Sequence, residues 1–456
     1  MKIFRRIFLT SILTVVLLIT LIYITILPNK NQILSKFNAA TDLTSTQSSC
    51  LGKKSWKSRY YYNLSLQTDV RYCKYNLRTS GEKDIVKLTI TTFDGLKRQK
   101  VIGGDSWRLF VQGAVYFNAD VIDKMDGTYE ARLELPVSGD YKFKLELEYS
   151  LCDGIRDPPT WWFINGTEHC KYQTAHLDRK GYIYKTHVLS FKKSKQNATV
   201  RVEKQTKNNT GTCIYVGTSK GYWARNGTKV KFTSMPKTKL FVFNKKHKQN
   251  TTLWVYGDSL GLRYYSYLKK RFICTDFFKN CKVTYNWVYP LYRGKEIARR
   301  IYDKKDFNDS IVLNDLKNVL TCKEMRNPKS VLLLNFGLHT MMGLTMNQSK
   351  TLLINFVKMY RNLKKIQLVP MVIWKTTTPT YRKYKDDHRF LTNHRIKLWN
   401  EFAKLVSCEE NFPIFDIYHV AASYPNFAID GIHFAEEVFD VPTNQLENFL
   451  AENLMK

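Results

Sequence analysis

The most constraining feature of this sequence is the alternation of short apolar segments with longer amphipathic ones after about residue 245. Uninterrupted apolar runs, such as SVLLLNFG at 330–337 and LVPMVIWKT at 368–376, are typical of strands buried on both faces. Segments with helical spacing stand between them, as in SKTLLINFVKMYRNLKKI at 349–366. This order predicts an α/β domain over residues 245–456, with a parallel sheet covered by helices on both sides.

The triplet Gly257-Asp258-Ser259 directly follows the first apolar segment of this domain, TLWVY at 252–256. The carboxyl ends of parallel strands lie at one edge of the sheet, where such proteins bind their ligands. We therefore predict that Ser259 is a catalytic nucleophile at this edge. Gly257 and Asp258 are expected beside it, close to the oxygen of the reacting carbonyl group.

The same three letters recur as Gly104-Asp105-Ser106, in GGDSWRLFVQG. Here a glycine-containing turn leads into an alternating segment, and no helical pattern follows. We interpret Ser106 as a turn residue without a chemical role.

A serine hydroxyl is a weak nucleophile until a base accepts its proton, and the base needs a third group to orient it. Two Asp-x-x-His pairs are candidates, Asp416 with His419 and Asp430 with His433. The second pair lies in a glycine-containing loop before the last helical segment, so this loop can fold over the strand ends. We predict that His433 is the base and that Asp430 orients it, with His419 as an ordinary surface residue.

Acyl chemistry also needs donors for a developing oxyanion. The backbone N–H of Ser259, at the start of a helix, is one expected donor. The segment NFGLHT at 335–340 offers Asn335 and His339 as side-chain donors, with Gly337 leaving room; the alternative for His339 is a polar residue that caps a loop. Gly294 is a third candidate.

Residues 51–240 have a different pattern, in which apolar and polar residues alternate over short segments. Examples are DIVKLTITTFD at 84–94, YEARLELPV at 129–137 and DYKFKLELEYS at 140–150, and glycine-containing turns separate them. Short alternating strands with regular turns predict a β-sandwich domain. The segment GTCIYVGTSKGYWARNG at 211–227 is interpreted as a connector to the C-terminal domain.

The N-terminus contains an uncharged apolar span at 7–27, preceded by Lys2, Arg5 and Arg6. Its length and basic flank predict a type II signal-anchor helix, with residues 1–6 as a cytoplasmic tail and 28–50 as a polar stem. The alternative is a signal peptide cleaved near Ala39-Ala40. Either way, the chain beyond the span would lie in the secretory lumen or outside the cell.

All nine cysteines follow this span, in a compartment where disulfides persist. Their odd number leaves at least one outside intramolecular pairs, and their spacing does not define the pairing. No C-x-x-C pair suggests zinc, so no metal is expected.

The formal net charge of +33 indicates an anionic partner. A nucleic acid is excluded by the predicted lumenal location, where acidic glycans and anionic lipid head groups are the available polyanions. The alternative is that the lysines only keep the surface soluble. We expect an acidic glycan or glycoprotein as partner, with sialylated glycans as the leading candidate.

Three motifs of the C-terminal domain resemble the SGNH/GDSL hydrolase superfamily and, more narrowly, its PC-esterase domains. They are VYGDS at 255–259, NFGLH at 335–339 and FDIYHVAASYPNFAIDGIHF at 415–434. In that group an aspartate on the last strand precedes the catalytic D-x-x-H, which supports Asp430 and His433. The third block departs from the usual G-x-N, because His339 stands where the superfamily has its asparagine donor.

The N-terminal domain is similar to the filamin/Ig-like domain of the NXPE family (neurexophilin and PC-esterase domain), through DGLKRQKVIGGDSWRLFV at 94–111 and the segment 121–150. The order of the two domains matches that family as well. The resemblance implies carbohydrate O-acetyl chemistry, in which acetyl groups are transferred to glycan hydroxyls or removed from them. We expect a glycan O-acetyltransferase of the Golgi membrane that has no bound cofactor and uses an acetyl donor such as acetyl-CoA. Alternatives are a carbohydrate O-acetyl esterase with the same triad, and a catalytically weak binding protein that is secreted or at the cell surface.

Overall fold

The computed structural model describes residues 50, 66–79, 85–158, 185–193, 213–227, 229–235, 249–285, 309–381 and 390–454. The predicted cytoplasmic tail, the signal anchor at 7–27, stem residues 28–49 and Gly294 lie outside these residues. In the ranges that are described, no helix combines the length and the apolar character needed to cross a bilayer.

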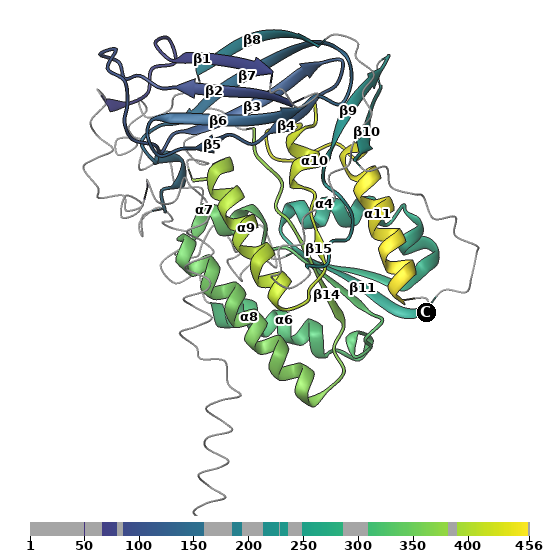
Figure 1. Ribbon diagram of the computed structural model, residues 1–456. Helices are drawn as coiled ribbons and strands as arrows, with labels where there is room; N and C mark the ends of the chain where they lie inside the picture. The colour runs from purple at the N-terminus through teal and green to yellow at the C-terminus, as the bar shows by residue number, and fades with distance from the viewer. Residues whose placement is uncertain are drawn as a thin grey trace, which may run out of the picture.

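Two antiparallel four-stranded sheets form the N-terminal domain (Figure 1). The first has the order β1-β2-β6-β5, with β1 at Lys74–Thr79, β2 at Ile85–Thr91, β6 at Thr128–Glu134 and β5 at Ile122–Asp123. The second has the order β4-β3-β7-β8, with β4 at Phe117–Ala119, β3 at Ser106–Gly113, β7 at Gly139–Tyr149 and β8 at Lys185–Lys193. A short 3-10 helix, η3 (Asp153–Ile155), follows β7.

Alternate residues of these strands enclose one hydrophobic core. In β2, Val86, Leu88 and Ile90 are buried, and the residues between them are partly exposed. Phe143 and Leu145 of the opposite sheet pack into the same cluster. This arrangement is the β-sandwich that the alternation predicts, whereas the filamin/Ig-like assignment stays a prediction.

The C-terminal domain contains a five-stranded sheet in which all neighbours are parallel, as the apolar runs predict. Its order is β12-β11-β13-β14-β15. The strands are β11 (Gln249–Gly257), β12 (Phe278–Tyr285), β13 (Val331–Leu334), β14 (Met371–Lys375) and β15 (Ile414–Phe415). Because β12 and β13 lie on opposite sides of β11, the strand order reverses at β11, and sheets of this kind bind ligands at such a point.

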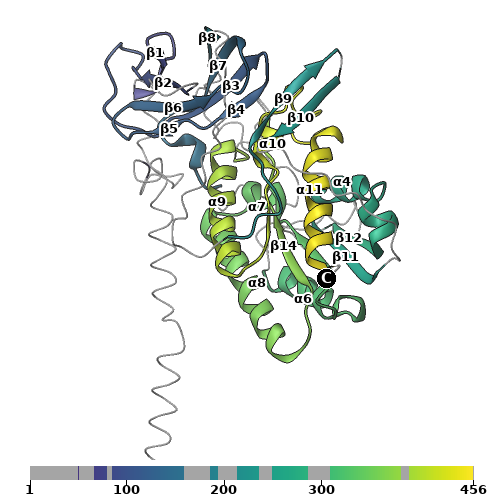
Figure 2. The same cartoon turned by 45° about the vertical axis from the view of Figure 1, so that its right-hand side comes forward.

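Helices cover both faces of this sheet (Figure 2). One face carries α6 (Asp309–Thr321), α8 (Met346–Ile366) and α9 (Asn393–Glu409), and the other carries α4 (Ser259–Leu268) and α11 (Glu437–Leu454). The remaining short elements are η6 (Ile273–Phe277), η8 (Lys323–Met325), α7 (Gly337–Gly343) and α10 (Tyr418–Ala422).

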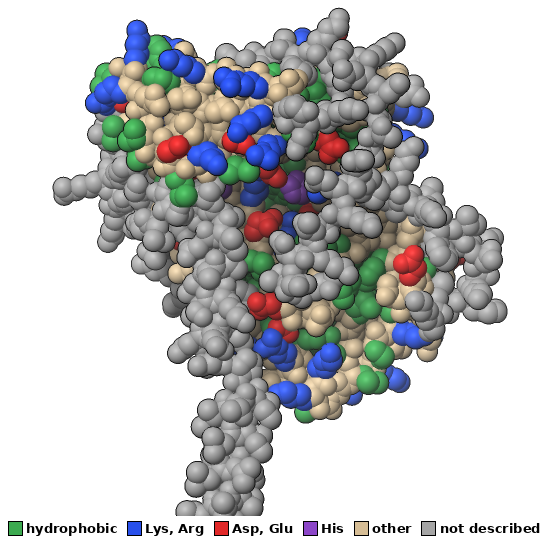
Figure 3. Space-filling view, viewed as in Figure 1, with side chains coloured by type: hydrophobic (Ala, Val, Ile, Leu, Met, Phe, Trp, Pro, Cys, Tyr) green, Lys and Arg blue, Asp and Glu red, His purple; other side chains and the backbone are tan. Residues whose placement is uncertain are grey.

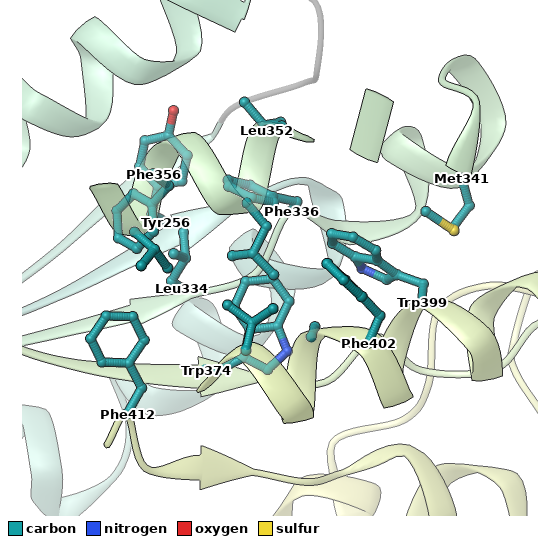
Figure 4. Packing of buried hydrophobic residues seen from close by; sticks show 14 of the residues in the cluster. Tyr256, Leu334, Phe336, Met341, Leu352, Phe356, Trp374, Trp399, Phe402 and Phe412 are labelled. Atoms are coloured by element: carbon teal, nitrogen blue, oxygen red, sulfur yellow. The ribbon is translucent and has the colours of Figure 1, made fainter. Parts of the chain in front are cut away.

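The three central strands, β11, β13 and β14, contribute residues alternately to two cores, one per face. On β14, Trp374 packs with Trp399 and Phe402 of α9 in the core that Figure 4 shows. Its neighbour Ile373 belongs to the core on the other face, together with Tyr264 of α4. Burial on both faces explains why these strands are apolar without interruption.

The connector packs on the C-terminal domain and is also bonded to the N-terminal one, where Tyr116 and Trp223 exchange two backbone hydrogen bonds at 2.8 Å. Its last residues form β9 (Gly221–Asn226), which makes a hairpin with the following strand, β10 (Lys229–Ser234), and Figure 2 shows this hairpin beside α11. Trp223 is fully buried there, and its Nε1 donates to the carbonyl oxygen of Val420 at 3.0 Å. A disulfide from Cys213 to Cys408 fixes the start of the connector to the end of α9.

Candidate active site

Ser259 is the first residue of α4 and follows β11 at the point where the strand order reverses. The turn before it passes close to the end of β13. A Cβ atom added at Gly257 would lie 3.0 Å from the carbonyl oxygen of Asn335, so glycine permits this approach. Because Ser259 begins α4, its hydroxyl lies at the positive end of the α4 dipole.

The structure brings Ser259, His433 and Asp430 into one hydrogen-bonded chain. His433 Nε2 lies 2.9 Å from the hydroxyl oxygen of Ser259. His433 Nδ1 lies 2.6 Å from Oδ2 of Asp430. With the Nδ1 proton donated to the carboxylate, Nε2 is left as an acceptor for the serine proton, which is the arrangement that activates a serine.

The loop around Asp430 holds the carboxylate in its ionised form. Oδ1 of Asp430 accepts hydrogen bonds from the backbone N–H groups of Ile432 at 3.0 Å and His433 at 2.8 Å. Partial burial opposes ionisation, but these two bonds and the His433 ring outweigh it and lower the pKa of Asp430. A charged Asp430 stabilises the imidazolium that forms when His433 takes a proton.

Asp258 is a buried link between the nucleophile turn and the segment after β13. Its Oδ1 accepts from the backbone N–H of Leu260 at 2.9 Å, which caps α4. Its Oδ2 accepts from the backbone N–H of Leu338 at 2.7 Å. Asp258 therefore supports the site rather than contacting a reacting carbonyl group as we predicted.

Asn335 and Gly337 also have structural roles. The amide Nδ2 of Asn335 donates to the Lys375 carbonyl oxygen at 2.7 Å and to Thr377 Oγ1 at 3.1 Å, so both of its hydrogens are used away from Ser259. This arrangement argues against the predicted side-chain donor role of Asn335. Gly337 has φ +73°, and a Cβ there would lie 2.0 Å from Oδ2 of Asp258.

His339 lies on the first turn of α7, which packs against α4. It stands at the position where G-x-N motifs have asparagine. Its donor role stays a prediction, and so does that of Gly294, which is outside the described residues.

The other Asp-x-x-His pair, Asp416 with His419, is engaged elsewhere. Asp416 pairs with Lys404 Nζ at 2.8 Å and accepts from Thr376 Oγ1 at 3.0 Å. Burial opposes ionisation of Asp416, and Lys404 overcomes this effect, so the pKa of Asp416 is lowered. His419 lies on α10 and lines a cavity between the domains.

The first copy of the triplet, Gly104-Asp105-Ser106, connects several segments of the β-sandwich by hydrogen bonds. Asp105 accepts from Lys100 Nζ at 2.9 Å and from Ser150 Oγ at 2.6 Å. Ser106 begins β3 and is buried, with its hydroxyl 3.4 Å from Glu148 Oε2. This position matches the interpretation of Ser106 as a residue where a turn leads into a strand.

Lys375 is a residue near the site that the sequence analysis missed. It ends β14 and is only 1 % exposed, and its Nζ has no hydrogen-bond partner among the described residues. Burial lowers the pKa of Lys375 to about 8, and the nearby charge of Asp258 opposes this shift. The sequence feature that could have indicated it is a lysine at the end of the otherwise apolar strand MVIWK.

A cavity of about 340 Å³ lies between the two domains. Figure 3 shows a hollow there with histidine and both kinds of charged side chain. Charged groups that line it pair with one another, as Arg108 does with Glu148 and Lys397 with Asp120. His394 lines it too, and burial together with Lys397 lowers its pKa to about 3.

Among solved structures, the chain is similar to a protein described as an acylhydrolase from Bacteroides fragilis, with 14% identity and a TM-score of 0.33 over 46% of this chain and 92% of that one. A GDSL-like lipase from Bacteroides thetaiotaomicron has 12% identity and a TM-score of 0.32, over 46% and 92% of the two chains. A carbohydrate acetylesterase family member from Sinorhizobium meliloti has 15% identity and a TM-score of 0.31, over 45% of this chain and 100% of that one.

These similarities are too distant to assign a family or an activity. No family model matches the chain, and no curated protein matches it. Membership of the NXPE family therefore stays a prediction.

Proposed function

We propose that this protein transfers acyl groups through Ser259 and that its reaction is the O-acetylation of carbohydrate hydroxyls. The observation that supports this most strongly is the chain of contacts from Asp430 through His433 to the Ser259 hydroxyl, at 2.6 Å and 2.9 Å. Its position at the carboxyl edge of a parallel sheet, where the strand order reverses, is the usual place for a ligand site.

In the first half of the reaction, Ser259 Oγ attacks the carbonyl carbon of the acyl donor, and His433 Nε2 takes the hydroxyl proton. The charge that develops on the carbonyl oxygen is stabilised by the N-terminus of α4, where the backbone N–H of Ser259 is a donor. The bond to the leaving group then breaks, and His433 returns the proton to that group. The product is an acyl ester of Ser259.

In the second half, a sugar hydroxyl gives its proton to His433 and attacks the acyl ester. Ser259 leaves and recovers its proton, and the sugar carries the acyl group. Water in place of the sugar would give hydrolysis by the same residues, so transfer requires that the acceptor reaches the ester before water does. The donor is proposed to be an acetyl thioester such as acetyl-CoA.

The net charge of +33 supports an acidic acceptor, with sialylated glycans as the leading candidate. The uncharged span at 7–27 with its basic flank supports a single-pass type II protein of the Golgi membrane. A secreted or cell-surface protein is the alternative location.

A fluorophosphonate probe tests the serine mechanism directly, because it labels a serine that a histidine activates. We expect the full chain to be labelled at Ser259, as located by peptide mass spectrometry. Ser259→Ala should abolish labelling and leave the melting temperature unchanged. Folded wild-type protein that stays unlabelled at Ser259 would refute the proposal.

Transfer and hydrolysis are separated by following the acetyl group from a donor with and without a glycan acceptor. Transfer predicts that the acceptor converts donor consumption into acetylated sugar, whereas an esterase releases acetate at the same rate in both cases. Treating the acceptor glycoprotein with sialidase tests its charge. We expect the treatment to lower kcat/KM, and a rise in salt to do the same, because exposed charges are screened over about 8 Å at physiological ionic strength.

A further inference from the structure

The loop at 424–434, which carries Asp430 and His433, is held by a residue of a different segment. The backbone N–H of Tyr381 donates to the carbonyl oxygen of Gly431 at 2.7 Å. The Tyr381 ring lies 4.9 Å from the ring of Phe427 and 5.9 Å from that of Phe434, both in the loop. Tyr381 therefore contacts the loop on both sides of the catalytic pair.

Strand β3 of the N-terminal sandwich packs directly on this assembly. Phe110 is 5 % exposed, although it does not belong to the sandwich core. Its ring meets Phe427 edge to face, with the centroids 5.5 Å apart, and lies 6.0 Å from the ring of Tyr381. An aromatic cluster from both domains thus backs the loop, and such pairs favour defined geometries.

Arg108, two residues earlier on β3, also contacts Tyr381. Its guanidinium lies 4.8 Å from the centre of the Tyr381 ring, and its Nη2 donates to the Thr380 carbonyl oxygen at 3.1 Å. That oxygen also accepts from Nδ2 of Asn393 at 2.8 Å. Thr380 and Tyr381 are therefore held by both domains at once.

Further contacts fix the sandwich on the C-terminal domain. The backbone N–H of Asn118 donates to Ser423 Oγ at 3.0 Å, directly before the loop begins. Asn393 Nδ2 donates to Glu148 of β7 at 2.9 Å. The buried Arg395 pairs with Asp157 at 3.2 Å. These bonds lie on several elements, so they oppose rotation of one domain against the other.

We propose that the N-terminal sandwich is a part of the catalytic apparatus and that Phe110, Arg108 and Tyr381 are positioning residues for the loop of Asp430 and His433. This inference rests on the proposed function. The sandwich holds the loop from behind, so that His433 Nε2 stays within hydrogen-bond distance of Ser259. A displacement of about 1 Å at such a site can lower a rate by roughly 10²-fold.

The test is Phe110→Ala in the full chain, with Leu109→Ala as the matched control. Leu109 is the adjacent residue of β3 and is fully buried, but it faces the sandwich core and not the loop. Both variants should lower the melting temperature. Only Phe110→Ala should slow fluorophosphonate labelling of Ser259 in the folded protein, by about tenfold or more.

Two further readouts separate positioning from simple loss of stability. The pH profile of labelling should shift in Phe110→Ala and stay in place in Leu109→Ala, because only the former loosens the contact between His433 and Asp430. Phe110→Leu, which refills most of the space, should recover most of the rate. It is also the variant to measure if Phe110→Ala does not fold, and its rate should then still lie measurably below that of the wild type.

Equal labelling rates and pH profiles in wild type, Phe110→Ala and Phe110→Leu would overturn the inference while leaving the serine mechanism in place. Equal slowing by Leu109→Ala would also overturn it, since the effect would then follow stability alone. Wild-type protein that is not labelled at Ser259 would instead overturn the proposed function.

Discussion

Gly337→Ala is the substitution that most directly tests how the site is built. The new Cβ would lie 2.0 Å from Oδ2 of Asp258, whereas ordinary contacts begin at 3.4 Å. The carboxylate therefore has to move by roughly 1 Å or more. That oxygen accepts the hydrogen bond from the backbone of Leu338, and the other oxygen caps α4 at Leu260. The substitution therefore disturbs the starts of both α7 and α4, and Ser259 belongs to the start of α4.

The expected loss of stability has two parts. Alanine at φ +73° costs about 1–2 kcal/mol relative to glycine. Weakening a buried hydrogen bond to a charged group costs about 1.5–3 kcal/mol more. The sum, about 2.5–5 kcal/mol, corresponds to a fall in melting temperature of roughly 10 °C for a domain of this size.

Gly227→Ala is the matched control, because Gly227 also has a positive φ, +61°, but a Cβ there meets nothing within 4 Å. It should lower the melting temperature by only about 3 °C and leave labelling of Ser259 unchanged. Gly337→Ala should slow that labelling by about 10²-fold. Differential scanning fluorimetry and probe kinetics measure both effects, and a Gly337→Ala protein that matches Gly227→Ala in both would refute this account of Asp258.

Three other predictions concern single side chains. Ser106→Ala should leave the rate of Ser259 labelling unchanged in folded protein, because Ser106 contacts Glu148 inside the fold; a rate loss like that of Ser259→Ala would contradict this. Asp430→Asn should slow labelling at neutral pH. Because the folded pKa of Asp430 is lowered, its contribution to stability is present above its ordinary value of 3.8 and lost as the pH falls; the wild type should therefore lose more thermal stability than Asp430→Asn between pH 5 and pH 3. Lys375 has a folded pKa of about 8 against 10.5 in the unfolded chain, so unfolded protein binds more protons in that range and stability rises with pH. Lys375→Met should remove this rise, and a variant that keeps the full rise would show that other groups cause it.

The sequence was sufficient for the features that depend on local pattern. Uninterrupted apolar runs predicted the parallel sheet, because strands such as β13 are buried on both faces. The position of Ser259 after β11 and of Asp430 and His433 before α11 followed from the order of elements. Those positions needed no knowledge of distances.

The rest depends on contacts between residues far apart in the chain. Nothing local in NFGLHT shows that the Asn335 amide bonds to the Lys375 carbonyl oxygen, 40 residues away, or that Asp258 binds the backbone of Leu338, 80 residues away. The connector looked like a link between domains because its glycines and aromatics have no clear period. The burial of Trp223 depends on its contacts with Val420 and Tyr424, about 200 positions later in the chain, and no local pattern indicates them.

The connector pairs with β15, the last strand of the parallel sheet, and this pairing protects the strand from aggregation once the chain has folded. Ile414 donates its backbone N–H to the carbonyl oxygen of Ile214 at 2.8 Å, and Val216 donates to Ile414 at 3.0 Å, so the outer side of the last strand is occupied. A bare outer strand is a template for aggregation. During synthesis the connector leaves the ribosome long before β15, since Cys213 and its partner Cys408 are separated by 195 positions. A fragment that starts at residue 245 would fold with that template uncovered, and a fragment that stops before residue 414 would leave the connector without the strand it covers.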